Sequence, residues 1–129
     1  MKKALLMLAF IACLASCKKD YPDFPTLNGT WELNSVLGGF GPAVVVPDDK
    51  KDRYVITINS RYVKTDADKT ETKGNFTVKF TEEHNGYRYG SITFTNPAYT
   101  DAFAFKADTI IIGSSAADGP SYKYIRIKK

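Results

Sequence analysis

Cysteine and histidine are scarce in this chain of 129 residues. Its two cysteines, Cys13 and Cys17, both lie within the first seventeen residues, and His84 is the single histidine. The chain beyond Cys17 can therefore form no internal disulfide, and it offers neither a cysteine ligand for a metal nor a cysteine nucleophile. One histidine cannot build a His-rich metal site, and neither Gly-x-Ser-x-Gly nor His-Glu-x-x-His occurs.

Long blocks of one charge are also missing. The formal charge is +4, and the 18 basic residues are interleaved with 14 acidic ones. This balance argues against nucleic acid as a partner, because such proteins gather their basic residues into a patch or stripe. After Cys17 no apolar run is long enough to cross a membrane as a helix.

The short motifs that could carry chemistry are incomplete. Glu82 and Glu83 are adjacent, so their side chains point apart in a strand. The Asp66-x-Asp68 pattern begins like a calcium loop, but it lacks the glycine at the sixth position and the glutamate at the twelfth. The glycines of residues 38–41 open no helix that could bind phosphate. We therefore expect a protein that is not an enzyme and that holds no cofactor and no metal.

The first seventeen residues carry a targeting signal. Lys2 and Lys3 precede an apolar run over residues 4–14, and small residues follow before Cys17. This pattern is typical of a secretory signal peptide. Leu-Ala-Ser-Cys at residues 14–17 resembles the lipobox of bacterial lipoproteins. The resemblance implies that Cys17 is acylated, becomes the first mature residue and anchors the chain to the bacterial outer membrane, on a face that the sequence leaves open.

The sequence then divides the chain into three parts. Residues 1–16 form the signal peptide, residues 17–27 the lipidated cysteine and a tether, and residues 28–129 the folded domain. Pro22 and Pro25 favour an extended tether. Ten such residues reach at most about 35 Å, so we expect the domain to lie close to the bilayer.

Period-two alternation of apolar and polar residues dominates the domain, and no window shows helical spacing with caps. Turn signals, of which Asn85-Gly86 is the strongest, separate the alternating runs. The pattern predicts an all-β fold of about eight antiparallel strands, closed as a sandwich or a barrel. The runs centre on residues 31–33, 54–58, 62–63, 76–80, 90–94, 103–105, 110–112 and 122–126.

Gly29-Thr30-Trp31 begins the first of these runs. It resembles the Gly-x-Trp motif of lipocalins, and the terminal Tyr-x-Tyr-x-Arg resembles that of short lipocalin-like lipoproteins. The resemblance implies an eight-stranded up-and-down barrel in which Arg126, on the last strand, packs over the Trp31 ring. Such a cation–π contact contributes about 0.5–2 kcal/mol.

One glycine-rich and then apolar loop, residues 38–47, interrupts the regular spacing of strands. We expect its valines to fold over an open barrel end as a plug, with a ligand portal as the alternative. The inward aromatic residues and this loop supply the candidate ligand-binding residues, which are Phe40, Val45, Phe76, Phe94, Phe103, Tyr122 and Tyr124.

Two functions remain open from the sequence. The first is a binding module for a small apolar or amphipathic ligand. The second is a filled barrel with a structural role, which contacts another envelope protein. Ligand sites typically exceed about 300 Å³, so a smaller enclosed pocket would favour the second.

Overall fold

The computed structural model describes residues 27–38, 41–113 and 119–127. The predicted signal peptide, Cys17, the tether up to residue 26 and Phe40 lie outside the described residues. The described part consists of nine strands and a short 3₁₀ turn at Asp48–Lys50. The strands are β1 (Gly29–Leu37), β2 (Val44–Val45), β3 (Arg53–Ile56), β4 (Arg61–Thr65), β5 (Glu71–His84), β6 (Tyr87–Thr95), β7 (Ala98–Lys106), β8 (Thr109–Ile112) and β9 (Ser121–Arg126).

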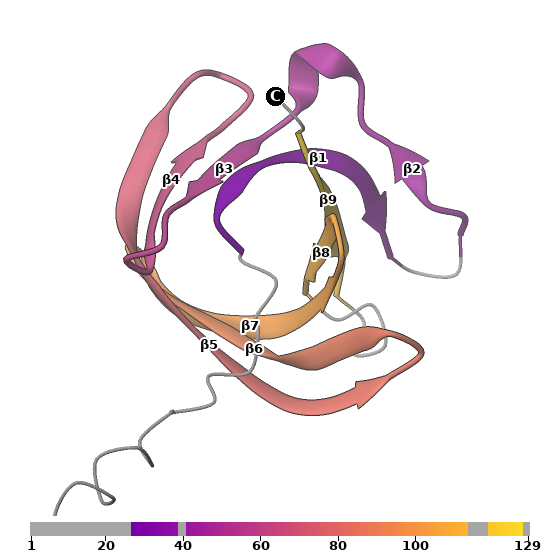
Figure 1. Cartoon of the computed structure of the whole chain (residues 1–129). Helices are drawn as coiled ribbons and strands as arrows, with labels where there is room; N and C mark the ends of the chain where they lie inside the picture. The colour runs from indigo at the N-terminus through magenta and orange to yellow at the C-terminus, as the bar shows by residue number, and fades with distance from the viewer. Residues whose placement is uncertain (1–26, 39–40, 114–118, 128–129) are drawn as a thin grey trace, which may run out of the picture.

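The strands form one closed antiparallel barrel (Figure 1). From β3 to β9 each strand pairs with the next along the chain, and β1 pairs with both β3 and β9. The two-residue β2 pairs with Ser35 and Val36 of β1 and lies outside the ring. Eight strands thus close on one another, which removes most free sheet edges. The predicted all-β, up-and-down fold of about eight strands is confirmed.

Alternating side chains explain the strands. On β1, Trp31, Leu33 and Ser35 are buried, while the residues between them are partly exposed. The same alternation on β3 buries Tyr54 and Ile56 and exposes Val55. Because successive side chains of a strand point to opposite faces, each strand presents one apolar face to the barrel interior.

Two β-bulges and one glycine bend the longest strands. The register shifts between Leu33 and Ser35 on β1, and between Phe80 and Glu82 on β5. Gly90 lies opposite Phe80, and a Cβ at this position would lie 1.9 Å from the carbonyl oxygen of Lys79. Only glycine allows this approach of the two backbones, so β5 and β6 curl together around the barrel.

The predicted hairpin at Asn85-Gly86 is confirmed. His84 pairs with Tyr87, and the two turn residues both have positive φ angles, 54° and 77°. This is the geometry of a two-residue type I′ turn, for which Asn-Gly is the preferred sequence.

Apolar side chains fill the middle of the barrel. Seven of the thirteen residues in the buried cluster carry a large aromatic ring on β3 to β9, and Trp31 adds an eighth. Aromatic rings bury the largest areas of any side chains, so the central interior is a packed core. The cluster consists of Trp31, Leu33, Tyr54, Ile56, Tyr62, Phe76, Ile92, Phe94, Phe103, Phe105, Ile110, Ile112 and Tyr124.

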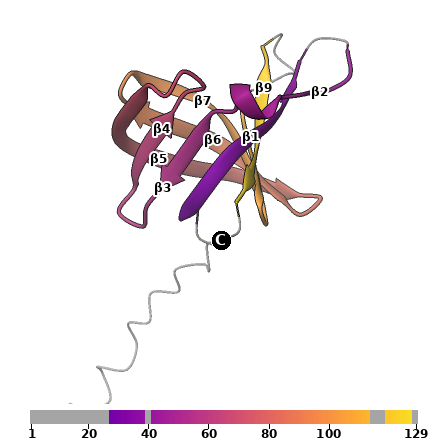
Figure 2. The ribbon, with the colours of Figure 1, turned by 90° about the horizontal axis from the view of Figure 1, so that it is seen from above.

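The barrel has two distinct ends. We call the end at which β1 begins the base, and the opposite end the top. The start of β1, the end of β9 and the β3–β4 and β7–β8 turns gather at the base, which is the lower end in Figure 2. The β5–β6 turn also reaches the base, because Lys106 at the end of β7 donates a hydrogen bond to the carbonyl of Asn85. Among the described residues, no helix is both long and apolar enough to cross a membrane.

Candidate functional site at the base of the barrel

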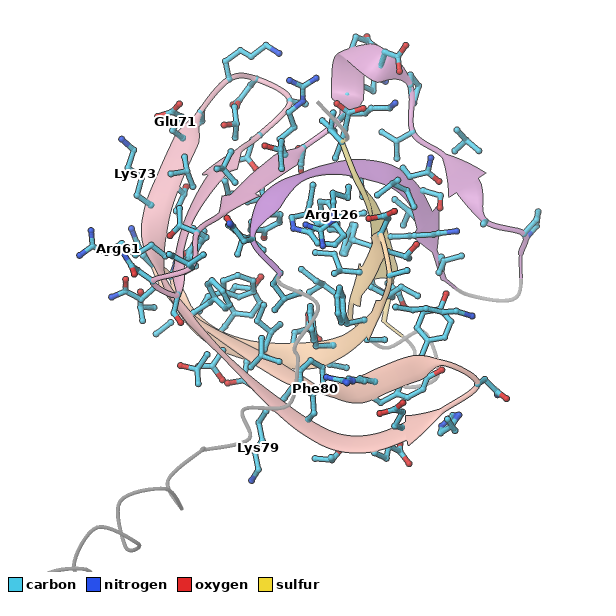
Figure 3. The ribbon with its side chains drawn as sticks, viewed as in Figure 1. Arg61, Glu71, Lys73, Lys79, Phe80 and Arg126 are labelled. Atoms are coloured by element: carbon cyan, nitrogen blue, oxygen red, sulfur yellow. The ribbon has the colours of Figure 1, made fainter. Side chains whose placement is uncertain are left out.

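Trp31 and Arg126 form the floor of the barrel at its base. They are opposite one another in the β1–β9 pair, and the guanidinium carbon of Arg126 lies 4.3 Å from the centre of the Trp31 ring. Trp31 is fully buried, and its indole nitrogen donates a 2.8 Å hydrogen bond to the carbonyl of Leu27. The contact that the Gly-x-Trp resemblance implied is therefore present, and Arg126 lies within the ring of strands (Figure 3).

Arg126 is held by further partners. Its Nε donates a 3.1 Å hydrogen bond to Asp108, and its Nη1 donates one to the carbonyl of Asn28. Gly29 adopts a φ of 141°, and a Cβ there would lie 2.9 Å from Arg126 Nη1. The glycine is needed both for this backbone conformation and for the space that the guanidinium takes.

A cavity of about 500 Å³ opens beside this floor. Its walls are mostly apolar, and three residues that carry hydroxyl groups, from the β3–β4 turn and β5, are also among the lining residues. The volume exceeds the roughly 300 Å³ at which small-molecule sites begin. The lining residues are Leu27, Asn28, Thr57, Ile58, Ser60, Phe76, Thr77, Val78, Phe80 and Phe105.

Unequal strand lengths create this cavity. The pairing of β4 with β5 ends where Arg61 faces Asn75, and the amide of Phe76 donates a hydrogen bond to the carbonyl of Ser60. β5 continues for eight residues beyond Phe76, paired with β6 alone among the described strands. The barrel wall therefore opens between the β3–β4 turn and β5, and the side chains of Val78 and Phe80 face the opening.

The candidate ligand-binding residues fall in different places. Phe76 lines the cavity at the base. Phe94, Phe103 and Tyr124 are at most 3% exposed and belong to the packed core, so they do not form this cavity's wall. Tyr122 was placed inward by the alternation, but it is 37% exposed. The β-bulge in β1 shifts the register of β1 against β9 near this position, and Ser121 rather than Tyr122 is buried.

The expected valine plug is wrong. Val44 and Val45 are 65% and 72% exposed, and they form β2 on the outside of the barrel. Val46 alone of the three packs against the core. Because β3 is short, its pairing with β1 stops at Glu32, and β2 supplies hydrogen bonds to the edge of β1 further along.

Most of the cavity-lining residues are not distinguished by the sequence. Val78, Phe80 and Phe105 lie within runs of alternating residues, and nothing in their spacing separates a core position from a cavity wall. Ile58 was counted within a strand, although it lies in the turn after β3 and is 77% exposed. One feature of the sequence could have indicated the cavity. The strand that ends at Thr65 is much shorter than the next strand, which ends at His84, and a long strand beside a short one leaves part of its edge unpaired.

A second group of aromatic residues lies at the top. Tyr54, Tyr62, Phe94 and Tyr99 surround a smaller space of about 230 Å³. Tyr62 donates a 2.5 Å hydrogen bond to the carbonyl of Asn96. Burial raises the pKa of the Tyr54 phenol well above its ordinary value, and the neighbouring phenols add to the effect. The phenol stays protonated at physiological pH, so this group offers packing and hydrogen bonds rather than a phenolate.

Lys64, the lysine that lines this smaller space, already forms ion pairs with carboxylates. Lys64 Nζ lies 2.8 Å from Asp66 and 3.6 Å from Asp52, and it approaches the Tyr54 ring. A ligand anion would have to compete with two carboxylates for this ammonium group. The base of the barrel, with its larger apolar cavity, is therefore the better candidate site.

Comparison with models of known protein families gave no match, and searches of curated proteins and of solved structures also found no similar protein. The barrel topology and the geometry at the base are therefore the grounds on which function can be argued.

Proposed function

We propose that this chain is a membrane-anchored lipoprotein of the bacterial cell envelope that binds a small apolar or amphipathic ligand without catalysing a reaction. The observation that carries the proposal is the cavity of about 500 Å³ at the base. Its apolar wall suits a hydrocarbon portion, and the polar residues Thr57 and Ser60 of the β3–β4 turn, which also line it, suit a polar portion. The lipobox resemblance at residues 14–17 supports an outer-membrane anchor through acyl chains on Cys17.

The other lipocalin features support the binding role in part. The Gly29, Trp31 and Arg126 arrangement closes the middle of the base beside the cavity. The core above it is filled, so the ligand site is the side of the base rather than a deep central calyx. A site of this size suits one short chain or one ring system.

Titration of the full chain with a fluorescent fatty acid tests the binding role. We expect saturable binding, and Val78→Trp should weaken it by about tenfold or more because the indole fills the cavity. Val55→Trp is the matched control, since Val55 lies on the outer face of β3 and is 42% exposed. Thermal unfolding establishes that both variants are folded. Equal affinity in the wild type and both variants would place binding elsewhere and contradict the proposal.

The filled core favours a second candidate, a structural lipoprotein that contacts another envelope protein. Exposed Val44 and Val45 on β2 would form the contact, because they are apolar and lie on a short outer strand. A photo-crosslinking residue at position 45 should then yield one discrete heavier product in cells. The same residue at position 55 is the control, and crosslinking of equal extent from both positions would count against a specific partner.

A further inference from the structure

The base of the barrel carries an exposed apolar tip. Ile58 lies in the β3–β4 turn and is 77% exposed, the largest value among the exposed large apolar side chains of the described residues. It stands beside Leu27, with which it lines the same cavity. Most of the Ile58 side chain is exposed, so it is available for an apolar contact outside the barrel.

Two basic side chains also lie toward the base, Arg61 beside this turn and Lys106 against the β5–β6 hairpin. Arg61 follows the same turn, is exposed and points away from the barrel (Figure 3). Lys106 ends β7, and its ammonium group lies 5.0 Å from the centre of the Tyr87 ring. Among the described residues neither cation lies within ion-pair distance of a carboxylate, whereas Arg126 is paired with Asp108 and Arg88 with Glu83. Glu82 on β5 is an exposed carboxylate and offsets only part of the charge of Arg61 and Lys106.

The top has a different character. Lys51 and Lys64 there are held by carboxylates, with Nζ–O distances of 2.7 Å to Asp48 and 2.8 Å to Asp66. The top turn over residues 66–70 carries two aspartates and one lysine, and it presents no large apolar side chain. Val44 and Val45 on β2 also expose apolar side chains toward the top, so the pairing of its lysines with carboxylates is what favours the base for an anionic surface.

The path of the chain selects the bilayer as the partner. The first described residue, Leu27, lies at the base, where its carbonyl accepts a hydrogen bond from Trp31, and it follows Cys17 by ten residues. Those residues span at most about 35 Å, so an anchor at Cys17 keeps the base close to the lipid headgroups. Because a short linker gives a high effective concentration, a small contact suffices to orient the domain.

We propose that the base of the barrel rests on the anionic surface of the bilayer, with Ile58 inserted among the lipids and with Arg61 and Lys106 on their headgroups. Basic side chains are attracted to anionic lipid, and a tyrosine such as Tyr87 suits the interfacial region. The proposal rests on the membrane anchor of the proposed function. In this orientation the cavity opening, which Ile58 borders, faces the lipids, and a ligand can pass between bilayer and barrel without crossing water.

Hydrogen exchange of the full chain in lipid vesicles tests the orientation. Vesicles of zwitterionic lipid are compared with vesicles of equal parts zwitterionic and anionic lipid, and flotation measures how much chain is bound to each. With anionic lipid we expect severalfold slower exchange in the turn over residues 57–61. The top turn over residues 66–70 should be unchanged and serves as the internal reference.

Matched variants identify the residues responsible. Ile58→Ser and Arg61→Ser should each abolish the slowing at the base, whereas Val45→Ser and Lys69→Ser replace similar exposed side chains away from the base and should preserve it. A chain that floats with the vesicles but shows no slowing at the base, or slowing at the top, overturns the docking proposal alone. A chain that neither floats nor shows slowing overturns the anchor and the docking together.

Discussion

The guanidinium carbon of Arg126 lies 4.3 Å from the centre of the buried Trp31 ring, and the two residues face one another across the strand pair that closes the barrel. The first and last strands of the described fold therefore share one contact, which also holds Asp108 and the carbonyl of Asn28. Loss of this contact should destabilise the pairing of the start of β1 with the end of β9.

A double-mutant cycle measures this relationship. Trp31→Ala should lower the free energy of unfolding by about 3–5 kcal/mol, because it leaves a cavity in the core. Arg126→Ala should lower it by about 1–2 kcal/mol through the lost cation–π contact and the lost packing of its stem. The double variant should lose less than the sum of the two, since the residues touch. Strict additivity in chemical denaturation would contradict the coupling.

Gly29 is predicted to tolerate no side chain. Its φ is 141°, and a Cβ at this position would lie 2.9 Å from Arg126 Nη1, so Gly29→Ala should destabilise the fold by about 1–3 kcal/mol. Gly41→Ala is the control, because a Cβ at Gly41 would meet nothing within 4 Å, and it should change stability by less than about 0.5 kcal/mol. Equal effects of the two substitutions would show that Gly29 is not constrained by Arg126.

The sequence predicted the barrel well because its evidence is local. Trp31 and Leu33 alternate on one strand, and Asn85-Gly86 specifies one turn type. The pairing of Trp31 with Arg126 needed the family resemblance, since 95 residues separate them and no local pattern connects them. The cavity could not be predicted, because it depends on where β4 stops pairing with β5.

Two residues lie elsewhere than the sequence predicts, and in both cases the reason lies in how strands pair. Tyr122 and Val45 were placed by alternation and by hydrophobicity, and both are exposed in the structure. The bulge between Leu33 and Ser35 shifts the register of β1 against β9, and a bulge is a property of two paired strands rather than of one sequence. The hydrophobicity of Val45 predicted that it would be buried, but in the structure it belongs to β2, which pairs with the edge of β1 on the outside of the barrel.

Glu32 should make stability dependent on pH. Although partial desolvation opposes the effect, hydrogen bonds from Lys51 and Arg53 lower the pKa of the Glu32 carboxyl below its ordinary value. A lowered pKa in the folded state stabilises the fold above the unfolded-state pKa, and this contribution is lost as the pH falls through the folded-state pKa. Because the pair is near the surface, the loss should be below about 1 kcal/mol.

Denaturation curves of the wild type and Glu32→Gln across acidic pH check this sign. The variant should be less stable than the wild type near neutral pH, and the difference should shrink on acidification as Glu32 becomes protonated. A difference that grows as the pH falls would show that the carboxylate destabilises the fold.

Cys17 should decide membrane attachment. Cys17→Ser removes the thiol that the lipobox resemblance assigns to acylation, so the variant should leave the membrane fraction or remain unprocessed. Cys13→Ser is the control, because Cys13 lies within the predicted signal peptide and should not affect the anchor. Fractionation of cells with immunodetection measures both. Processed Cys17→Ser protein at wild-type level in the membrane would contradict the lipoprotein assignment.

The central claim is that the cavity at the base holds a small apolar or amphipathic molecule. Native mass spectrometry of the protein extracted from its own membrane tests this claim most directly. We predict a protein ion that carries one non-covalent small molecule, which Val78→Trp loses and Val55→Trp retains. A ligand-free spectrum of the wild type, or a bound molecule that persists in Val78→Trp, would contradict the claim.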